Sequence, residues 1–241
     1  MELKILTFNI QSCKDYIKKD FNPKVSGDAI KEINPDIVGL NEVRGKGNDE
    51  FFTNQTRTLA NYANFKYYIF GQAITVLNKG PYGNAMLSKY PFTNIEIIKI
   101  PDPLVKDEDA YYESRGIIKS TIEVNGKYLN VISTHVGLAR GEQKNAIATL
   151  KELIKPILVK NEPLILLGDF NMTPDDELIS ELKEYIDDTT DLIEGSINTF
   201  PSIDSIKKID YIFTKNVVVK KVQVEKIVAS DHFPLSAIIE L

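Results

Sequence analysis

The chain has 241 residues, 43% hydrophobic and 26% charged, a composition that supports a sizeable globular core without covalent crosslinks. Its 29 basic and 34 acidic residues give a net charge of −5, which excludes a global positive field that would draw nucleic acid to the whole surface.

The start of the chain predicts two strands, and each ends at a polar residue. Residues 3–8 alternate apolar and polar side chains before Asn9, and residues 36–40 form an apolar run before Asn41-Glu42. Two helices are predicted around the second strand: residues 26–33, with Ser26 as the N-cap, and residues 49–61.

Glycine and proline punctuate the middle of the chain, where a series of strands is expected. The dipeptide Asn125-Gly126 is the strongest short hairpin signal a sequence offers, and strand-like segments flank it on both sides. The predicted strands of this region are residues 67–70, 84–88, 95–100, 117–124 and 128–133.

A long helix and a buried strand follow. Residues 142–158 have apolar side chains at helical spacing, and residues 163–167 form a continuous apolar run, which predicts a strand buried on both faces. Thr173 is predicted to cap a further helix that has Pro174 in its first turn. The last third predicts strands again, at residues 209–213, 217–228 and 235–241.

Asparagine, acidic and histidine residues recur within or just beyond these apolar runs. Carboxylates are costly to place near a core unless they are paired or bound to metal, so the pattern predicts that the side chains converge on one site. The only two histidines of the chain belong to this set, although either alone would more often be structural. The set is Asn9, Glu42, His135, Asp169, Asn171, Asp210, Asp231 and His232.

Six short motifs carry a family resemblance that runs from Leu6 to Leu235. The strings LTFNI, GLNEV, ISTHVG, LLGDFNMTP, KIDYIF and SDHFPL occur in the order found in the endonuclease/exonuclease/phosphatase superfamily, which includes deoxyribonuclease-I-like metal-dependent phosphohydrolases. The resemblance implies an α/β fold of the DNase I type: a four-layer sandwich of two packed mixed β-sheets flanked by helices, with the site at one end. Residues 1–241 are expected to form one such domain.

The resemblance also implies a metal site. Glu42 would bind the divalent cation, with Asn9 near it in the same network and Asp231 as a second acid linked to the metal. Carboxylate and amide oxygens suit Mg²⁺ or Mn²⁺.

The catalytic roles follow from the same resemblance. Asp169 would orient or polarise the attacking water, and Asn171 would donate its amide to the phosphoryl oxygens. His232, held in its tautomer by Asp210, would contact the scissile phosphate or act as base. His135 would bond to the phosphate or protonate the leaving group, and the division of acid and base between the two histidines stays open.

Two further residues are predicted to bind substrate. Arg115 precedes the strand at 117–124, in a position that resembles the family's phosphate-side arginine, although a surface salt bridge fits it equally well. Asn84 lies in a segment that resembles a structural strand of the family with a substrate contact. The variable stretch 102–114, with Asp107, Glu108, Asp109, Tyr111 and Tyr112, is read as a solvated loop or as a gate to the site.

The resemblance implies a magnesium-dependent phosphodiesterase or phosphatase in which Asp169 and His232 activate a water. The alternatives are a DNA or RNA nuclease, including processing of DNA ends like that of tyrosyl-DNA phosphodiesterases, and an inactive binding module. The expected partner is a phosphate ester, either a small molecule or nucleic acid.

Location and assembly are predicted from what the sequence lacks. There is no signal-peptide pattern at the N-terminus and no apolar run near the ~20 residues of a membrane span, so a cytoplasmic monomer without membrane contact is expected. The single cysteine, Cys13, excludes a disulfide within the chain and has no nucleophile–base pattern around it.

Overall fold

The computed structural model describes residues 1–107, 109–193 and 195–241. Their strands form two six-stranded mixed sheets that pack face to face. The first sheet has the order β11-β12-β1-β2-β4-β3, with β1 Glu2–Asn9, β2 Ile37–Arg44, β3 Tyr67–Val76, β4 Gly80–Ser88, β11 Val218–Val224 and β12 Leu235–Glu240. The second has the order β5-β6-β7-β8-β10-β9, with β5 Phe92–Lys99, β6 Gly116–Val124, β7 Lys127–His135, β8 Leu164–Asp169, β9 Asp187–Asp188 and β10 Asp210–Lys215.

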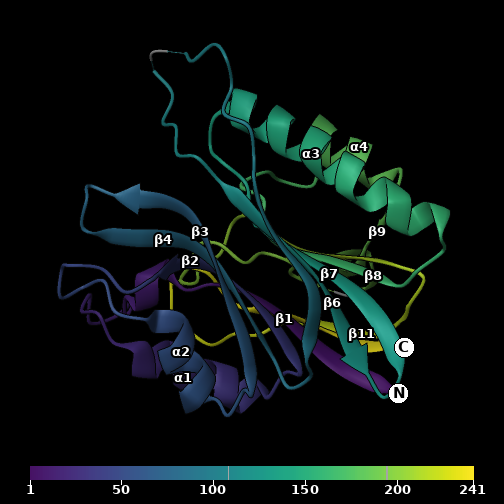
Figure 1. The fold of residues 1–241 in the computed structure, drawn as a ribbon, viewed down its shortest axis with the longest axis horizontal. Helices are drawn as coiled ribbons and strands as arrows, with labels where there is room; N and C mark the ends of the chain where they lie inside the picture. The colour runs from purple at the N-terminus through teal and green to yellow at the C-terminus, as the bar shows by residue number, and fades with distance from the viewer. Residues whose placement is uncertain (108, 194) are drawn as a thin grey trace.

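Helices cover the outer faces of both sheets (Figure 1). Helices α1 Pro23–Ile33 and α2 Gln55–Tyr62 pack on the first sheet, and α3 Arg140–Val159 and α4 Glu177–Lys183 pack on the second. Two short 3-10 turns, η1 Gln11–Cys13 and η2 Thr189–Leu192, complete the described elements. The four-layer sandwich predicted from the family resemblance is therefore confirmed. None of the described helices is long and apolar enough to cross a membrane.

Strand alternation divides the core among the layers. On β1, Leu3 and Ile5 point between the sheets, whereas Leu6 and Phe8 point toward α1 and α2. Because successive side chains on a strand face opposite sides, a central strand between two buried faces must be apolar on both. This explains the continuous apolar run of β8, whose first five residues and the final Asp169 are all buried.

The predicted strands are confirmed, but three helix starts are wrong. Helix α1 begins at Pro23, because the side chain of Asn22 accepts from the Lys24 amide and supplies the N-cap. Ser26, the predicted cap, is buried inside the helix. Proline fits the first helical position because it has no amide proton to satisfy there.

The other two helices begin later than predicted, whereas α1 begins earlier. Helix α2 is capped by Asn54 and begins at Gln55 rather than near residue 49. In α4 the cap is Asp176, whose carboxylate accepts from the Leu178 amide, while the Thr173 hydroxyl donates to Asp175. Each segment offers several capping residues within a few positions, and tertiary packing selects among them.

Candidate active site

Strand register brings the predicted residues to one end of the sandwich. Asn9 pairs with Asn41 in the parallel ladder of β1 and β2, and His135 pairs with Asp169 in that of β7 and β8. Asp210 begins β10 directly opposite Asp169, because these two strands are antiparallel. Carboxyl ends of parallel strands meet the amino ends of antiparallel neighbours at the same edge, so distant parts of the chain converge.

Asn9 joins the two sheets. Its Nδ2 donates to Glu42 Oε1 at 3.1 Å and to Asp169 Oδ2 at 3.0 Å. A register shift between Leu40 and Val43, together with a φ of 59° at Glu42, re-aims the end of β2. Burial raises the pKa of Glu42, and the bond from Asn9 opposes that rise. The carboxylate is thus held where a cation would relieve its desolvation.

His232 lies between two buried acids. Its Nδ1 donates to Asp210 Oδ2 at 2.8 Å, and its Nε2 lies 3.7 Å from Asp169 Oδ2. Burial alone would lower the pKa of His232, but the charges of Asp210 and Asp169 outweigh it and raise the pKa to about 10. Burial raises the pKa of Asp169 to about 7, against the pull of His232. His232 is therefore an imidazolium at neutral pH, beside a carboxyl that readily exchanges a proton.

His135 has the opposite environment. Burial, followed by the charges of Arg115 and His232, holds its pKa well below 6.5. The Arg115 guanidinium lies 3.0 Å from Nδ1, and because a guanidinium only donates, Nδ1 must accept. The neutral ring then carries its proton on Nε2, which lies 3.5 Å from Asp169 Oδ2. Arg115 thereby fixes the tautomer of His135.

Asn171 completes the group around Asp169. Its backbone amide donates to Asp169 Oδ1 at 2.9 Å, and its Nδ2 donates to Val136 O at 2.9 Å and lies 3.2 Å from His135 Nε2. A left-handed backbone, with φ 51°, turns the chain back so that the amide faces the histidine. Asparagine adopts this conformation more readily than most residues.

Arg115 and Asn84, the two residues predicted to bind substrate, have different surroundings. Arg115 is 9% exposed and pairs with Glu113 at 2.7 Å, so its ion pair belongs to the site rather than to the surface. Asn84 is buried, donates to Gly116 O at 2.8 Å and accepts from Asn41. Both ends of its amide are engaged in the protein, which favours a structural role over the predicted substrate contact.

Sequence reasoning missed Asn41 as a site residue. Its Oδ1 accepts from the Asp169 amide at 3.0 Å, and its Nδ2 donates to Asn84 at 3.0 Å and to Thr134 O at 2.8 Å. This buried amide therefore ties β2 and β4 of one sheet to β7 and β8 of the other. Its place directly before Glu42 was a signal, but nothing in the sequence indicates that it points between the sheets.

Gln11 was also missed. It lies in η1, where three consecutive residues, Gln11, Ser12 and Cys13, have positive φ. This turn carries the Gln11 amide to Asp231, where Nε2 donates to Oδ2 at 2.7 Å. Asp231 also accepts from the Ser230 hydroxyl at 3.0 Å. Cys13 is fully buried, and burial raises its pKa to about 12, the reverse of what a nucleophile needs.

The stretch between β5 and β6 leads directly into the site at Glu113 and Arg115. The amide of Asp107 donates to the Tyr112 hydroxyl at 2.7 Å, and Tyr111, which is exposed, donates to Glu113 at 3.1 Å. Glu108 lies outside the described residues. The gating role of this stretch stays a prediction.

The donor set fits a hard divalent cation. Among the described residues, Asp169, Asp210 and His232 lie with one polar side-chain atom each within 4.8 Å of one another, and the two carboxylates offer the oxygens of this group. Two buried oxygens, Asp210 Oδ1 and Gln11 Oε1, have no hydrogen-bond partner, and the amide of Gln11 binds Asp231 through its Nε2. Buried oxygens without donors, beside a carboxylate with a raised pKa, are what an oxygen-binding cation would satisfy.

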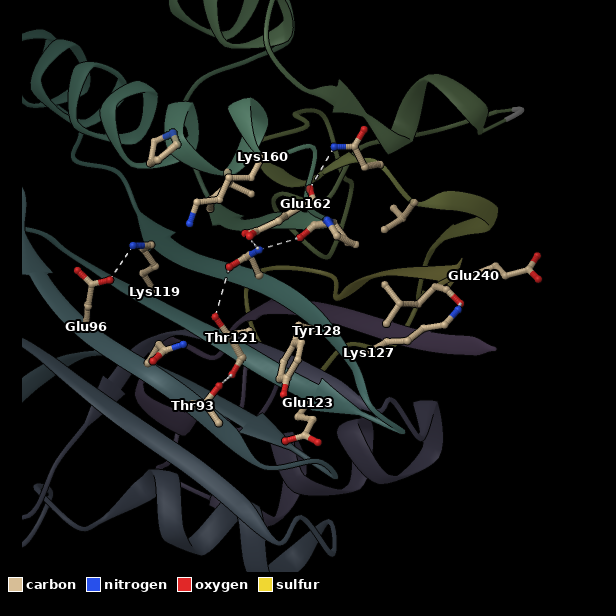
Figure 2. A pocket seen from close by; sticks show the side chains of 18 of the residues that line it. Thr93, Glu96, Lys119, Thr121, Glu123, Lys127, Tyr128, Lys160, Glu162 and Glu240 are labelled. Atoms are coloured by element: carbon tan, nitrogen blue, oxygen red, sulfur yellow. Dashed lines mark hydrogen bonds and ion pairs between the residues drawn. The ribbon is translucent and has the colours of Figure 1, made fainter.

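A hollow of about 320 Å³ opens beside Glu42, with Gln11 and Tyr82 among its walls. Figure 2 shows a second, larger groove of the molecule. Its volume is about 1500 Å³, and none of the ten predicted site residues lines it. It is bordered by Lys127 and Tyr128 at the start of β7, whereas His135 ends that strand. The larger groove therefore lies at the opposite end of the sandwich from the histidines.

Comparisons with known proteins agree with this geometry. Residues 6–232 match the model of the Endonuclease/Exonuclease/phosphatase family. An uncharacterized protein of Escherichia coli K12, YbhP, is 27% identical over 99% of this chain and 96% of its own. The structure of an endonuclease/exonuclease/phosphatase from Beutenbergia cavernae superposes with a TM-score of 0.80 and 20% identity, over 100% of this chain and 72% of its own. A mannosyl-6-phosphatase of Bacteroides thetaiotaomicron superposes with a TM-score of 0.79 and 18% identity, over 99% and 100% of the two chains.

Proposed function

Because the chain belongs to the Endonuclease/Exonuclease/phosphatase family, we propose that it is a divalent-metal-dependent phosphodiesterase or phosphatase that uses water as its nucleophile. The observation that supports this proposal is the buried cluster in which Asp169 is bonded through Asn9 to Glu42 and faces both histidines. The similarity to a mannosyl-6-phosphatase adds support for phosphate esters as the substrate class.

We assign the metal site to Glu42, Asn9 and Asp231, with Mg²⁺ or Mn²⁺ as the ion. Gln11, which lines the hollow with Glu42 and donates to Asp231, has an unpartnered oxygen that would add to this set. When bound, such an ion neutralises charge on the phosphoryl oxygens and makes bound water more acidic.

In this proposal Asp169 accepts a proton from the attacking water. With a pKa of about 7, it is part-ionised at neutral pH, the range in which a general base works best. The water oxygen forms the new bond to phosphorus as the bond to the leaving oxygen breaks. The proton displaced from the water passes to the carboxylate of Asp169, and the leaving oxygen departs as an anion that takes its proton from solvent water.

The two histidines would then act differently. His232, cationic and oriented by Asp210, presents Nε2–H to the negative phosphoryl oxygens. His135, neutral and oriented by Arg115, presents Nε2–H as a hydrogen-bond donor to the phosphate or the leaving oxygen. Asn171 adds an amide donor beside it. Preorganised donors of this kind stabilise charge that develops in the transition state.

The test is hydrolysis of bis-p-nitrophenyl phosphate with and without Mg²⁺. We expect release of p-nitrophenol that requires the metal and is lost in Asp169→Asn and His232→Ala. Glu96→Gln, in the distant groove, is the matched control and should behave like the parent. Equal activity in the parent and both site variants would exclude the assigned cluster, and no activity on any phosphate ester would favour the inactive binding module.

A further inference from the structure

The hollow beside Glu42 is lined by cations and aromatic rings that have no role in the proposed hydrolysis. Its walls carry two cations, Lys14 and Arg44, and the rings of Phe21, Phe52 and Tyr82. These residues come from the loop after β1, the end of β2, the segment before α2 and β4. A cavity of about 320 Å³ with apolar walls and a few charged groups has the size and lining of a site for a small ligand.

The two cations lack acidic partners within the part of the chain that the structure describes. No carboxylate oxygen among residues 1–107, 109–193 and 195–241 lies within 4.0 Å of Lys14 Nζ or of the Arg44 guanidinium. Two acids in this region pair with other cations: Glu113 pairs with Arg115, and Asp49 pairs with Lys79 at 3.4 Å. Glu42 and Glu113 also line the hollow, but neither pairs directly with Lys14 or Arg44, so these two cations remain able to bind an anion that enters it.

The side chain of Arg44 lies beside two aromatic rings. Its guanidinium carbon lies 4.5 Å from the centre of the Phe21 ring and 4.9 Å from that of Phe52. The only hydrogen bond of this guanidinium to the described residues is a long one, from Nη1 to Phe51 O at 3.4 Å. The guanidinium therefore has N–H groups left to donate, and a planar fork of N–H groups is the preferred bidentate partner of phosphate.

Arg44 lies two residues beyond Glu42 on β2, and both side chains line the hollow. An ester at Glu42 and an anion at Arg44 can therefore belong to one molecule. The rings of Phe21, Phe52 and Tyr82 line the same hollow and suit an organic linker such as a sugar or a base.

We propose that this hollow binds a second phosphate of the substrate, carried on the same molecule as the ester that is cleaved. The proposal rests on the proposed function, because it takes the cluster at Glu42 and Asp169 as the place of hydrolysis. The second phosphate could be the neighbouring phosphodiester of a single nucleic acid strand or the second group of a small bisphosphate. Both sources present the same chemistry to Lys14 and Arg44.

The first experiment measures binding, so that it stands apart from hydrolysis. Calorimetry with Mg²⁺ compares thymidine 3′,5′-bisphosphate with thymidine 5′-monophosphate. We expect the parent to prefer the bisphosphate by about tenfold or more, the usual size of one charge-assisted contact. Arg44→Ala and Lys14→Ala should each reduce that ratio toward one, whereas Arg57→Ala, which removes a charge from the exposed face of α2, should preserve it.

The second experiment separates the two sources. Single-stranded thymidine pentanucleotide and a 3′-phosphorylated p-nitrophenyl thymidine 5′-phosphate are offered as substrates to the parent and to Arg44→Ala. A KM that rises in the variant for the pentanucleotide alone identifies a strand, and one that rises for the small ester identifies a bisphosphate; either supports the proposal. Equal affinity of the parent for the two nucleotides, or a preference unchanged in Arg44→Ala of parental melting temperature, would overturn it. If the parent hydrolyses neither substrate but keeps its preference for the bisphosphate, the result counts against the proposed function and not against the second phosphate site.

Discussion

The two ends of the sandwich treat polar side chains in opposite ways. At one end, Asn9, Asp169 and Asp210 are about 1% exposed, and several acceptors compete for few donors. At the other end, the larger groove is lined by more exposed polar side chains, among which Lys119 pairs with Glu96 at 2.6 Å (Figure 2). The same strands, β7 and β8, run from one end to the other.

This difference teaches that cavity size is a poor guide to the site in this fold. Burying an ionised group costs free energy unless a partner offsets it, and the exposed pairs of the groove incur little of that cost. Clusters of buried groups with shifted pKa values are concentrated at functional sites, although a single buried pair such as Lys208 with Asp188 can be structural. Under the proposed function, the end with the smaller hollow, next to Glu42, is the one that acts on substrate.

The largest expected effect is that of Asp169→Asn. We expect kcat to fall by about 10³-fold or more, because the variant keeps the shape of the site but cannot accept a proton. Thermal unfolding should not move to lower temperature, since the change removes a buried carboxylate that Asp210 and burial both disfavour. Kinetics and calorimetric melting on the same sample test the expected fall in kcat and the expected melting temperature. A large drop in melting temperature would show that Asp169 is mainly structural.

Arg115→Gln should have a smaller effect, about 10- to 100-fold on kcat, because it acts through His135. With only two histidines in the chain, NMR titration reports each ring separately. In metal-free parent protein we expect one ring neutral from pH 6 to 8 and the other titrating near pH 10. The variant should raise the pKa of the neutral ring toward 6.5. An unchanged titration would mean that Arg115 does not orient His135.

Stability should also depend on pH. His232 has a pKa of about 10 when folded and about 6.5 when unfolded, so its contribution is complete below pH 6.5 and is lost as the pH rises through 10. Asp169, with a pKa raised to about 7, also loses stability as the pH rises toward 7. Lys208, whose pKa burial lowers to about 8, works in the opposite direction above pH 8.

The melting temperature in chelator should therefore fall between pH 6.5 and 8. Asp210→Asn should flatten that slope, because Asp210 raises the pKa values of both His232 and Asp169. Differential scanning calorimetry at half-unit pH steps measures it. A parental slope that is flat or rising would show that the buried cluster does not hold the charges assigned to it.

The sequence predicted the strands well because their signals are local. Asn125 and Gly126 both have positive φ, as their hairpin requires, and β6 and β7 pair on either side of them. Helix starts were predicted less well, since neighbouring caps compete. Lys208 shows a further limit: among the lysines of the last quarter it resembles a solvated edge residue, yet it is 2% exposed, pairs with Asp188 and lies 3.5 Å from the centre of the Tyr211 ring.

At the site, residue types could be predicted and contacts could not. Asp169, His135 and His232 follow from motifs and from their positions at strand ends, and the structure brings them together. Asn41 and Gln11 were missed because their roles depend on which way a side chain turns across the gap between sheets. The alternation of side chains along one strand does not specify which residues they contact on the other sheet.

The smallest expected effect is at the groove. Lys119→Ala removes an ion pair to Glu96 that is partly open to water, so it should cost about 0.2–1 kcal/mol and leave kcat/KM within about twofold. Tyr128→Ala, also on the groove wall, tests the same end through an uncharged side chain that is 57% exposed. Melting curves and the bis-p-nitrophenyl phosphate assay serve for both. If either variant lost activity tenfold while keeping its melting temperature, the groove would be coupled to the reaction, and burial of charge would no longer separate the functional end from the other.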